Sequence, residues 1–164
     1  MKAVLGAGID RNRSVGKRVQ YSAIPLNDEA RDWLANEGIA APDSDGRAPT
    51  PTELKATLEA LDDQSVAYNI NTTNWQAQID DRQSPETGPW TMLNVSNYSD
   101  DPDEPCEFYF TKGWPELIVI ILFDISKTCG PFLVVPDTGC PPAVVHADTD
   151  IEKLLTTWEH LIGG

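Results

Sequence analysis

Apolar residues recur at helical spacing in a segment that we expect to form the first helix, from about Asp28 to Glu37. Asn27 is suited to begin it, because its side-chain oxygen can accept an unpaired backbone N–H of the first turn. Gly38 fits the left-handed position just beyond the end. A polar linker rich in Pro, Asp and Gly follows at about residues 40–49. We expect the buried face of this helix to carry Ala30, Trp33 and Leu34.

Two more helices begin with capping-box sequences, in which a Ser or Thr is followed three residues later by Glu or Gln. Thr50 and Glu53 open one of them, which should end near Asp63. Thr149 and Glu152 open the last helix of the chain. Both segments place large apolar residues on one face, as a helix packed on a core requires. These residues are Leu54, Leu58 and Leu61 in the first and Ile151, Leu154, Leu155, Trp158, Leu161 and Ile162 in the second.

Alternating apolar and polar residues predict strands in much of the remaining chain. Short polar turns separate several neighbouring strands, and this pattern is typical of β-hairpins. The expected strands lie at about residues 3–5, 19–23, 66–70, 75–79, 92–96, 107–110, 132–135 and 143–146.

The segment from Pro115 to Cys129 fits two structures. Its centre, Leu117 to Phe123, is apolar throughout, as in a buried strand. Pro115 at the start, Lys127 near the end and Gly130-Pro131 beyond it are helix boundary signals. A length of 15 residues is also long for a strand. We therefore predict a buried helix.

These elements predict one α+β domain over residues 1–164. An antiparallel sheet built of hairpins carries about four helices, and the C-terminal half has the order ββαββα. A chain of 164 residues and 18.0 kDa is the right size for a single hydrophobic core.

The charge of the chain is strongly acidic, with 12 Lys and Arg against 26 Asp and Glu, a net charge of −14. Residues 1–22 hold five basic groups and one acidic group, so the remaining residues hold 7 basic and 25 acidic groups, net −18. Such a surface repels nucleic acids and anionic membranes and favours basic partners. The three cysteines form no disulfide framework, and no secretory signal or bilayer-length apolar run occurs. We expect a cytoplasmic protein.

Motifs for catalysis or cofactor binding are weak. The Gly-rich segment from Gly6 to Lys17 matches neither a phosphate-binding loop nor a dinucleotide fingerprint, so we interpret it as an exposed turn. Cys106, Cys129, Cys140 and His146 are suitable zinc ligands, but their spacing fits no local zinc motif. We expect no metal and no cofactor. Two alternatives stay open. One is a small enzyme or ligand-binding domain that uses Cys140, His146 and a carboxylate. The other is a homo-oligomeric structural protein, which the apolar run from Leu117 to Phe123 suggests if its outer face is uncovered.

The strongest candidate for function is the acidic loop from Ser99 to Pro105, which has aromatic residues nearby. Tryptophans in neighbouring loops could be partly exposed and anchor a partner protein, although the acidic loop could also be simply solvated or bind a divalent cation. We expect a protein-binding module rather than an enzyme. Small acidic α+β domains occur among bacterial toxin immunity proteins, and this analogy suggests an inhibitor or immunity-type protein that covers a basic partner. The expected partner-binding residues are Asp100, Asp101, Asp103, Glu104, Trp90 and Trp114.

Overall fold

The computed structural model describes residues 20–70, 75–96, 101–137 and 141–162, without the side chains of Ile70 and residues 157–162. The expected strand at residues 3–5, the loop from Gly6 to Lys17 and the side chain of Trp158 lie outside this description. The elements are β2 (Gln20–Pro25), α1 (Asp28–Asn36), α2 (Pro51–Glu59), β3 (Gln64–Ile70), β4 (Trp75–Asp81), β5 (Trp90–Ser96), β6 (Glu107–Thr111), α3 (Pro115–Cys129), β7 (Phe132–Pro136), β8 (Ala143–Val145) and α4 (Ile151–Ile162).

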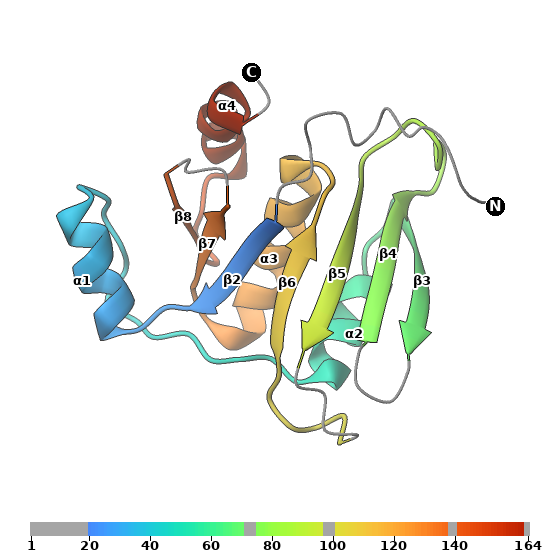
Figure 1. Cartoon of the computed structure of the whole chain (residues 1–164), viewed down its shortest axis with the longest axis horizontal. Coiled ribbons are helices and arrows are strands. Elements are labelled where there is room, and N and C mark those ends of the chain that lie inside the picture. The colour runs from blue at the N-terminus through green and yellow to red at the C-terminus, as the bar shows by residue number, and fades with distance from the viewer. Residues whose placement is uncertain (1–19, 71–74, 97–100, 138–140, 163–164) are drawn as a thin grey trace.

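The described strands form one antiparallel sheet in the order β3-β4-β5-β6-β2-β7-β8 (Figure 1). Hairpins join β3 to β4, β5 to β6 and β7 to β8. The chain from β5 onward runs β5, β6, α3, β7, β8, α4, which confirms the predicted ββαββα order. β2 comes from the N-terminal part of the chain and lies between β6 and β7, so it joins the two pairs of C-terminal strands into one sheet.

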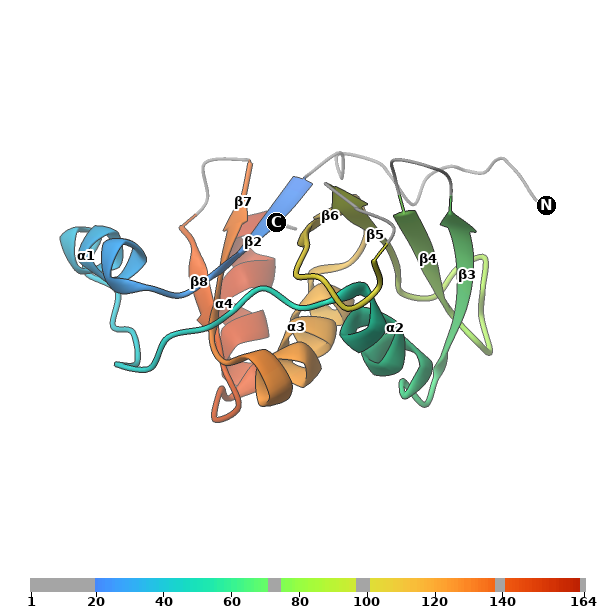
Figure 2. The same ribbon diagram turned by 90° about the horizontal axis from the view of Figure 1, so that it is seen from below.

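Three helices, α2, α3 and α4, cover one face of the sheet (Figure 2). α3 is the central one, and its exposure is low on most sides because strands and the other two helices surround it. The prediction of a buried helix at residues 115–129 is therefore confirmed, with the same bounds. The main core between the helices and the sheet is built of large apolar side chains, among them Leu54, Leu58, Trp75, Ile79, Phe110, Leu117, Ile118 and Phe132.

Helix α1 packs on the opposite face of the sheet. Side chains alternate along β7, so Phe132 and Val134 enter the main core while Leu133 faces the other way. Leu133 joins a second, small cluster with Leu26, Ala30 and Leu34. α1 is thus held to the body of the protein by few buried residues.

The helix ends largely follow the predicted capping residues. Asn27 accepts the Ala30 N–H at 2.8 Å, and the N–H of Ile39 returns to the Leu34 carbonyl at 2.9 Å around Gly38, whose φ is +75°. This is a Schellman ending, which satisfies carbonyls that have no partner inside the helix. In α2 the predicted capping box is present, although the helix ends at Glu59 rather than near Asp63.

Two details of the predicted helices need correction. α4 is capped by Asp150, which accepts the Lys153 N–H at 3.2 Å, one residue later than expected. The hydroxyl of Thr149 instead accepts the N–H of His146 at 2.8 Å. Trp33, expected in the core, is 41% exposed. Ala30 and Leu34 are the residues of α1 that are buried in the small cluster with Leu26 and Leu133, and Trp33 is not part of it.

Of the helices described, none is both long enough and apolar enough to cross a membrane.

Candidate functional site

The residues of the predicted partner surface lie at two ends of the β5–β6 hairpin. Asp101, Asp103 and Glu104 are exposed in the loop before β6, at the lower edge of the sheet in Figure 1. Trp90 begins β5 at the opposite end of the strands, where its carbonyl accepts the N–H of Trp114 at 2.9 Å. Seven residues of extended strand span about 20 Å. The structure therefore brings the two tryptophans together but separates them from the acidic loop, and Asp100 lies outside the described residues.

Residues 101–104, the described acidic part of this loop, form a hydrogen-bonded turn. The Asp101 carboxylate accepts the N–H of Asp103 at 2.9 Å, and the Pro102 carbonyl accepts the N–H of Thr52 at 3.0 Å, which ties the loop to the first turn of α2. In the described part of the chain, no group of three or more His, Cys, Asp or Glu side chains is placed to hold a metal ion. The two tryptophans differ in exposure, with Trp90 at 9% and Trp114 at 39%.

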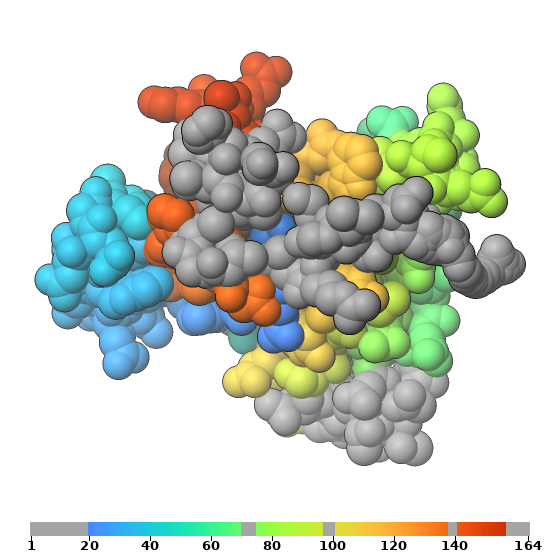
Figure 3. Space-filling model, turned by 45° about the horizontal axis from the view of Figure 1, so that its top comes forward, coloured from blue at the N-terminus to red at the C-terminus, as the bar shows by residue number. Residues whose placement is uncertain are grey.

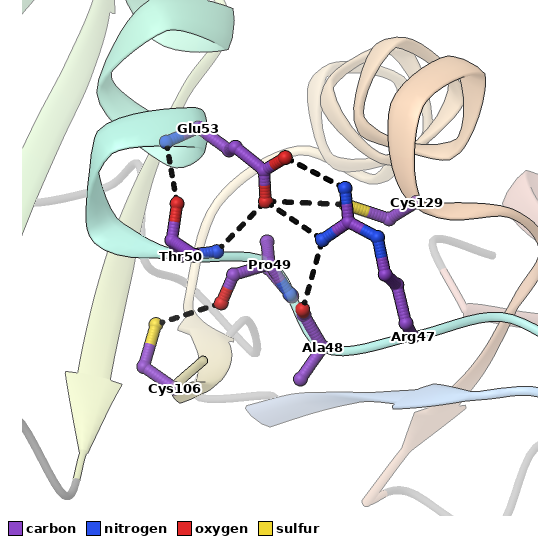
Figure 4. Close-up of polar contacts among 7 residues, drawn as sticks. All are labelled: Arg47, Ala48, Pro49, Thr50, Glu53, Cys106 and Cys129. Atoms are coloured by element: carbon purple, nitrogen blue, oxygen red, sulfur yellow. Dashed lines mark hydrogen bonds and ion pairs between the residues drawn. The ribbon is translucent and has the colours of Figure 1, made fainter. Parts of the chain in front are cut away.

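Cys106 and Cys129 lie near the place where the start of α2, the end of α3 and the start of β6 come together (Figure 4). We call this place the junction. Glu53, the capping-box residue of α2, accepts hydrogen bonds from both terminal nitrogens of Arg47, at 2.9 and 2.7 Å. The Cys129 thiol donates to the same carboxylate at 3.9 Å. The Cys106 thiol donates to the Pro49 carbonyl at 3.4 Å. The junction therefore fastens the segment before α2 to two other elements.

The chemistry of this junction favours structure over catalysis. The Arg47 guanidinium, followed by the hydrogen bonds at the helix start, lowers the pKa of Glu53 to about 2. Burial raises the pKa of Cys106 to about 11, and burial followed by the Glu53 charge raises the pKa of Cys129. A nucleophilic cysteine needs a lowered pKa, because the thiolate is the reactive form. Both thiols therefore stay protonated near neutral pH.

His146, the histidine of the enzyme alternative, also stabilises a turn through a hydrogen bond. Its Nδ1 accepts the backbone N–H of Asp148 at 3.2 Å, so this nitrogen is occupied as an acceptor. Cys140, its proposed partner, lies outside the described residues. Within the described ranges, no carboxylate forms a hydrogen bond with the imidazole that would orient it as a base.

A second cluster of exposed acidic residues is the segment of residues 28–45, which we call the acidic lobe. It comprises α1 and the chain that follows, and it projects from one end of the molecule (Figure 3). Six acidic residues and one basic residue give it a net charge of −5. The acidic residues are Asp28, Glu29, Asp32, Glu37, Asp43 and Asp45, all of them exposed.

Arg31, the single basic residue of the acidic lobe, forms its ion pairs within the lobe. The Arg31 side chain is 17% exposed and its guanidinium binds the carboxylates of Asp28 and Asp45. It also donates to the carbonyls of Pro42 and Ser44, at 3.5 and 3.0 Å. Arg31 therefore folds the chain after α1 back onto the helix. The other four carboxylates of the lobe form no ion pair with any described residue.

Apolar surface accompanies this charge. Trp33 is 41% exposed on α1 itself. Ile24, 42% exposed, lies on β2 directly across from Leu133, on the face where α1 packs. An exposed aromatic ring on an acidic helix is a suitable anchor for a protein partner, since aromatic residues supply much of the binding energy of interfaces.

An open groove of about 1040 Å³ borders the acidic lobe. The chain just after α1 forms one wall, β8 and the prolines before it form the floor, and the start of α4 forms the other wall. Its surface is mainly apolar, with Ile39, Ala41, Pro142, Val144 and Leu154. The charged residues at the α4 wall are Asp148, Asp150 and Lys153. The lobe, Trp33 and the groove together form our candidate site.

Sequence reasoning missed Trp33 as a site residue because its helical position resembles that of a core residue. The signal that could have found it is the composition of its own helix, in which four carboxylates flank a single tryptophan between residues 28 and 37. Comparison with known proteins finds no family model, no curated protein and no solved structure that this chain matches.

Proposed function

We propose that the protein is an acidic protein-binding module of the inhibitor or immunity type, whose acidic lobe covers a basic surface of a partner protein. The observation that carries this proposal is the exposed Trp33 on a helix where Glu29 and Asp32 form no ion pair with a described residue. We also propose that the protein is a cytoplasmic bacterial protein and that it does not bind nucleic acid.

Charge and aromatic surface have different roles in such an interface. The lobe carboxylates that Arg31 does not bind attract a basic partner and orient it during approach, which mainly raises the rate of association. Trp33 supplies contact area once the partner is seated, because a large ring loses little conformational freedom on binding. The adjacent groove extends the apolar contact toward α4.

Capture of partners by the immobilised protein tests the proposal. At low salt we expect a basic protein to be retained, and we expect its release at about 1 M sodium chloride, where charges are screened beyond roughly 3 Å. Trp33→Ala should weaken retention strongly. Trp114→Ala is the matched control, because Trp114 is exposed to a similar degree but lies outside the acidic lobe. Retention that is equal for both variants, or no retained basic protein, would contradict the proposal.

A further inference from the structure

Strand β3 forms an edge of the sheet, and no described element lies beyond it (Figure 1). Proteins usually protect such edges with short strands, prolines or charged residues, because unpaired backbone groups invite another strand. β8, at the other edge, has three residues and follows two prolines. β3 has seven residues, none of them charged and none proline. This edge is therefore unprotected by its own sequence.

The pairing of β3 with β4 shows which backbone groups face outward. Arg82 donates its N–H to the Asp63 carbonyl at 2.8 Å, and the same register pairs Ser65 with Asp80. In an antiparallel pair, residues that bond to the partner strand alternate with residues that do not. Odd-numbered residues of β3 therefore bond to β4. The even-numbered residues, which direct N–H and C=O groups away from the sheet, are Gln64, Val66, Tyr68 and Ile70.

Those outward groups are nearly all unused by the part of the chain that the structure describes. The Gln64 carbonyl accepts one hydrogen bond from Arg82 Nη2 at 3.0 Å, and a carbonyl can accept a second. No hydrogen bond to a described residue uses the outward groups of Val66 or Tyr68. Tyr68 contacts α2 through its side chain alone, by a bond from its hydroxyl to Glu59 and by the Lys55 amine over its ring.

We propose that two copies of the chain pair antiparallel along β3, about a two-fold axis at Ala67. This register places Val66 opposite Tyr68 and Gln64 opposite Ile70, so every outward-facing residue meets another outward-facing residue. Each such pair exchanges two backbone hydrogen bonds. Ala67 faces its own copy in a pair without hydrogen bonds, where side chains come closest.

The side chains of β3 are compatible with this arrangement. On the face toward the helices, Val66 meets Tyr68, a β-branched and aromatic pair of the kind that stabilises sheets. On the other face, Ser65 meets Asn69 and Ala67 meets Ala67, so no bulky or like-charged groups oppose one another.

The acidic residues nearest to β3 do not block the pairing. Asp62 and Asp63 precede the strand, so antiparallel pairing places those of the two copies at opposite ends, at least about 27 Å apart. The net charge of −14 per chain still opposes association over longer distances. Salt should therefore strengthen the dimer, whereas it should weaken binding of a basic partner, so the two proposals can fail independently.

Charge placed at the two-fold axis tests the dimer. Ala67→Lys and Ala67→Glu each put like charges directly opposite each other, while the exposed side chain leaves the bonds to β4 intact. Each variant alone should raise the dimer dissociation constant at least about tenfold. An equimolar mixture of the two should restore dimers, because Lys then faces Glu. Ala35→Lys and Ala35→Glu, at an exposed position of α1 outside β3, are controls that should leave the dimer dissociation constant unchanged.

Sedimentation velocity of the full chain, at low and at about 1 M sodium chloride, provides the measurement. We expect a wild-type dimer whose population rises with salt, two monomeric Ala67 variants and a dimeric mixture. A wild-type monomer at the highest soluble concentration in high salt would overturn the proposal. Dimers that persist equally in both Ala67 variants would also overturn it, because the contact would then lie elsewhere.

Discussion

Glu53 shows how one carboxylate can stabilise several parts of a fold. It accepts the N–H of Thr50 and thereby completes the capping box at the start of α2. It also accepts two hydrogen bonds from Arg47, in the segment that leads from α1. The sequence predicted the capping box because its spacing is local. The contacts with Arg47 and with Cys129 were not predictable, since they depend on how distant segments pack.

The first prediction concerns this carboxylate. Its pKa is lowered to about 2 from an ordinary value of 4.5. Its charge therefore stabilises the folded state above pH 4.5, and this contribution is lost as the pH falls toward 2. Glu53→Gln keeps a capping group but removes the charge, so we expect a loss of at most about 1 kcal/mol at pH 7, since Arg47 is half exposed.

Urea unfolding of the wild type and of Glu53→Gln between pH 7 and pH 2 measures this effect. The difference in unfolding free energy should shrink as the pH falls below 4.5 and be nearly zero at the lowest pH. A difference that stays constant over the whole range would show that the charge of Glu53 contributes nothing.

The second prediction concerns the thiols. Burial raises the pKa of Cys106 to about 11 from an ordinary 9.0. The thiol form thus stabilises the folded state fully below pH 9. Stability falls as the pH rises from 9 to 11, because over this range the unfolded thiol ionises before the folded one. At pH 8, iodoacetamide should alkylate Cys106 and Cys129 at least about tenfold more slowly in the folded protein than in urea, because both are buried. Peptide mapping would resolve each cysteine, and equal rates in the two states would refute the assignment.

At the scale of elements, local signals predicted helix positions well. Asn27, Gly38, Thr50 and Pro51 lie where the caps of α1 and α2 require them, and α3 has the bounds that its flanking residues indicated. Caps depend on hydrogen bonds between residues three or four positions apart, so the sequence contains the needed information. The start of α4 was misplaced by one residue because Thr149 and Asp150 are both good caps and the His146 turn uses Thr149.

The order of the strands in the sheet could not be predicted from the sequence. The hairpins were predictable because their strands are adjacent in the chain and joined by short turns. β2 pairs with β6 and with β7, both more than 80 residues away along the chain, and no local pattern specifies those partners. The position of α1 on the opposite face follows from this order, since it depends on the outward side of β7. For the same reason the separation of the acidic loop from Trp90 and Trp114 could not be foreseen.

The third prediction compares the two cores. Leu34→Ala removes a side chain from the small cluster that holds α1, whereas Ile118→Ala creates a cavity in the main core. Both residues are fully buried, so each substitution should cost about 2–5 kcal/mol if the whole fold responds. We expect that full cost only for Ile118→Ala. In Leu34→Ala, the limited contact of α1 should instead allow local opening of the lobe.

Native-state hydrogen exchange distinguishes the two responses. Leu34→Ala should accelerate exchange in residues 28–37 while β4, β5 and β6 keep the protection of the wild type. Ile118→Ala should accelerate exchange throughout the sheet. Uniform acceleration in both variants would mean that α1 and the main core unfold as one unit.

At the scale of the whole molecule, the acidic residues are spread over several regions. They occur in the lobe, in the loop before β6, around the β3–β4 hairpin and at the start of α4. Net charge alone therefore favours no particular face. What distinguishes the acidic lobe is the combination of exposed carboxylates, an internally bound Arg31, an exposed Trp33 and an adjoining groove.

Two charge-reversed proteins with equal net charge test whether the acidic lobe is the surface that binds the partner. One carries Glu29→Lys and Asp32→Lys in the acidic lobe, and the other carries Asp101→Lys and Asp103→Lys in the loop before β6; all four side chains are exposed. Both are immobilised beside the wild type, and the retained basic proteins are quantified by mass spectrometry. We predict that the wild type and the loop variant retain the same basic protein and that the lobe variant loses it. Loss in the loop variant alone, or equal retention by all three, would contradict a partner surface on the acidic lobe.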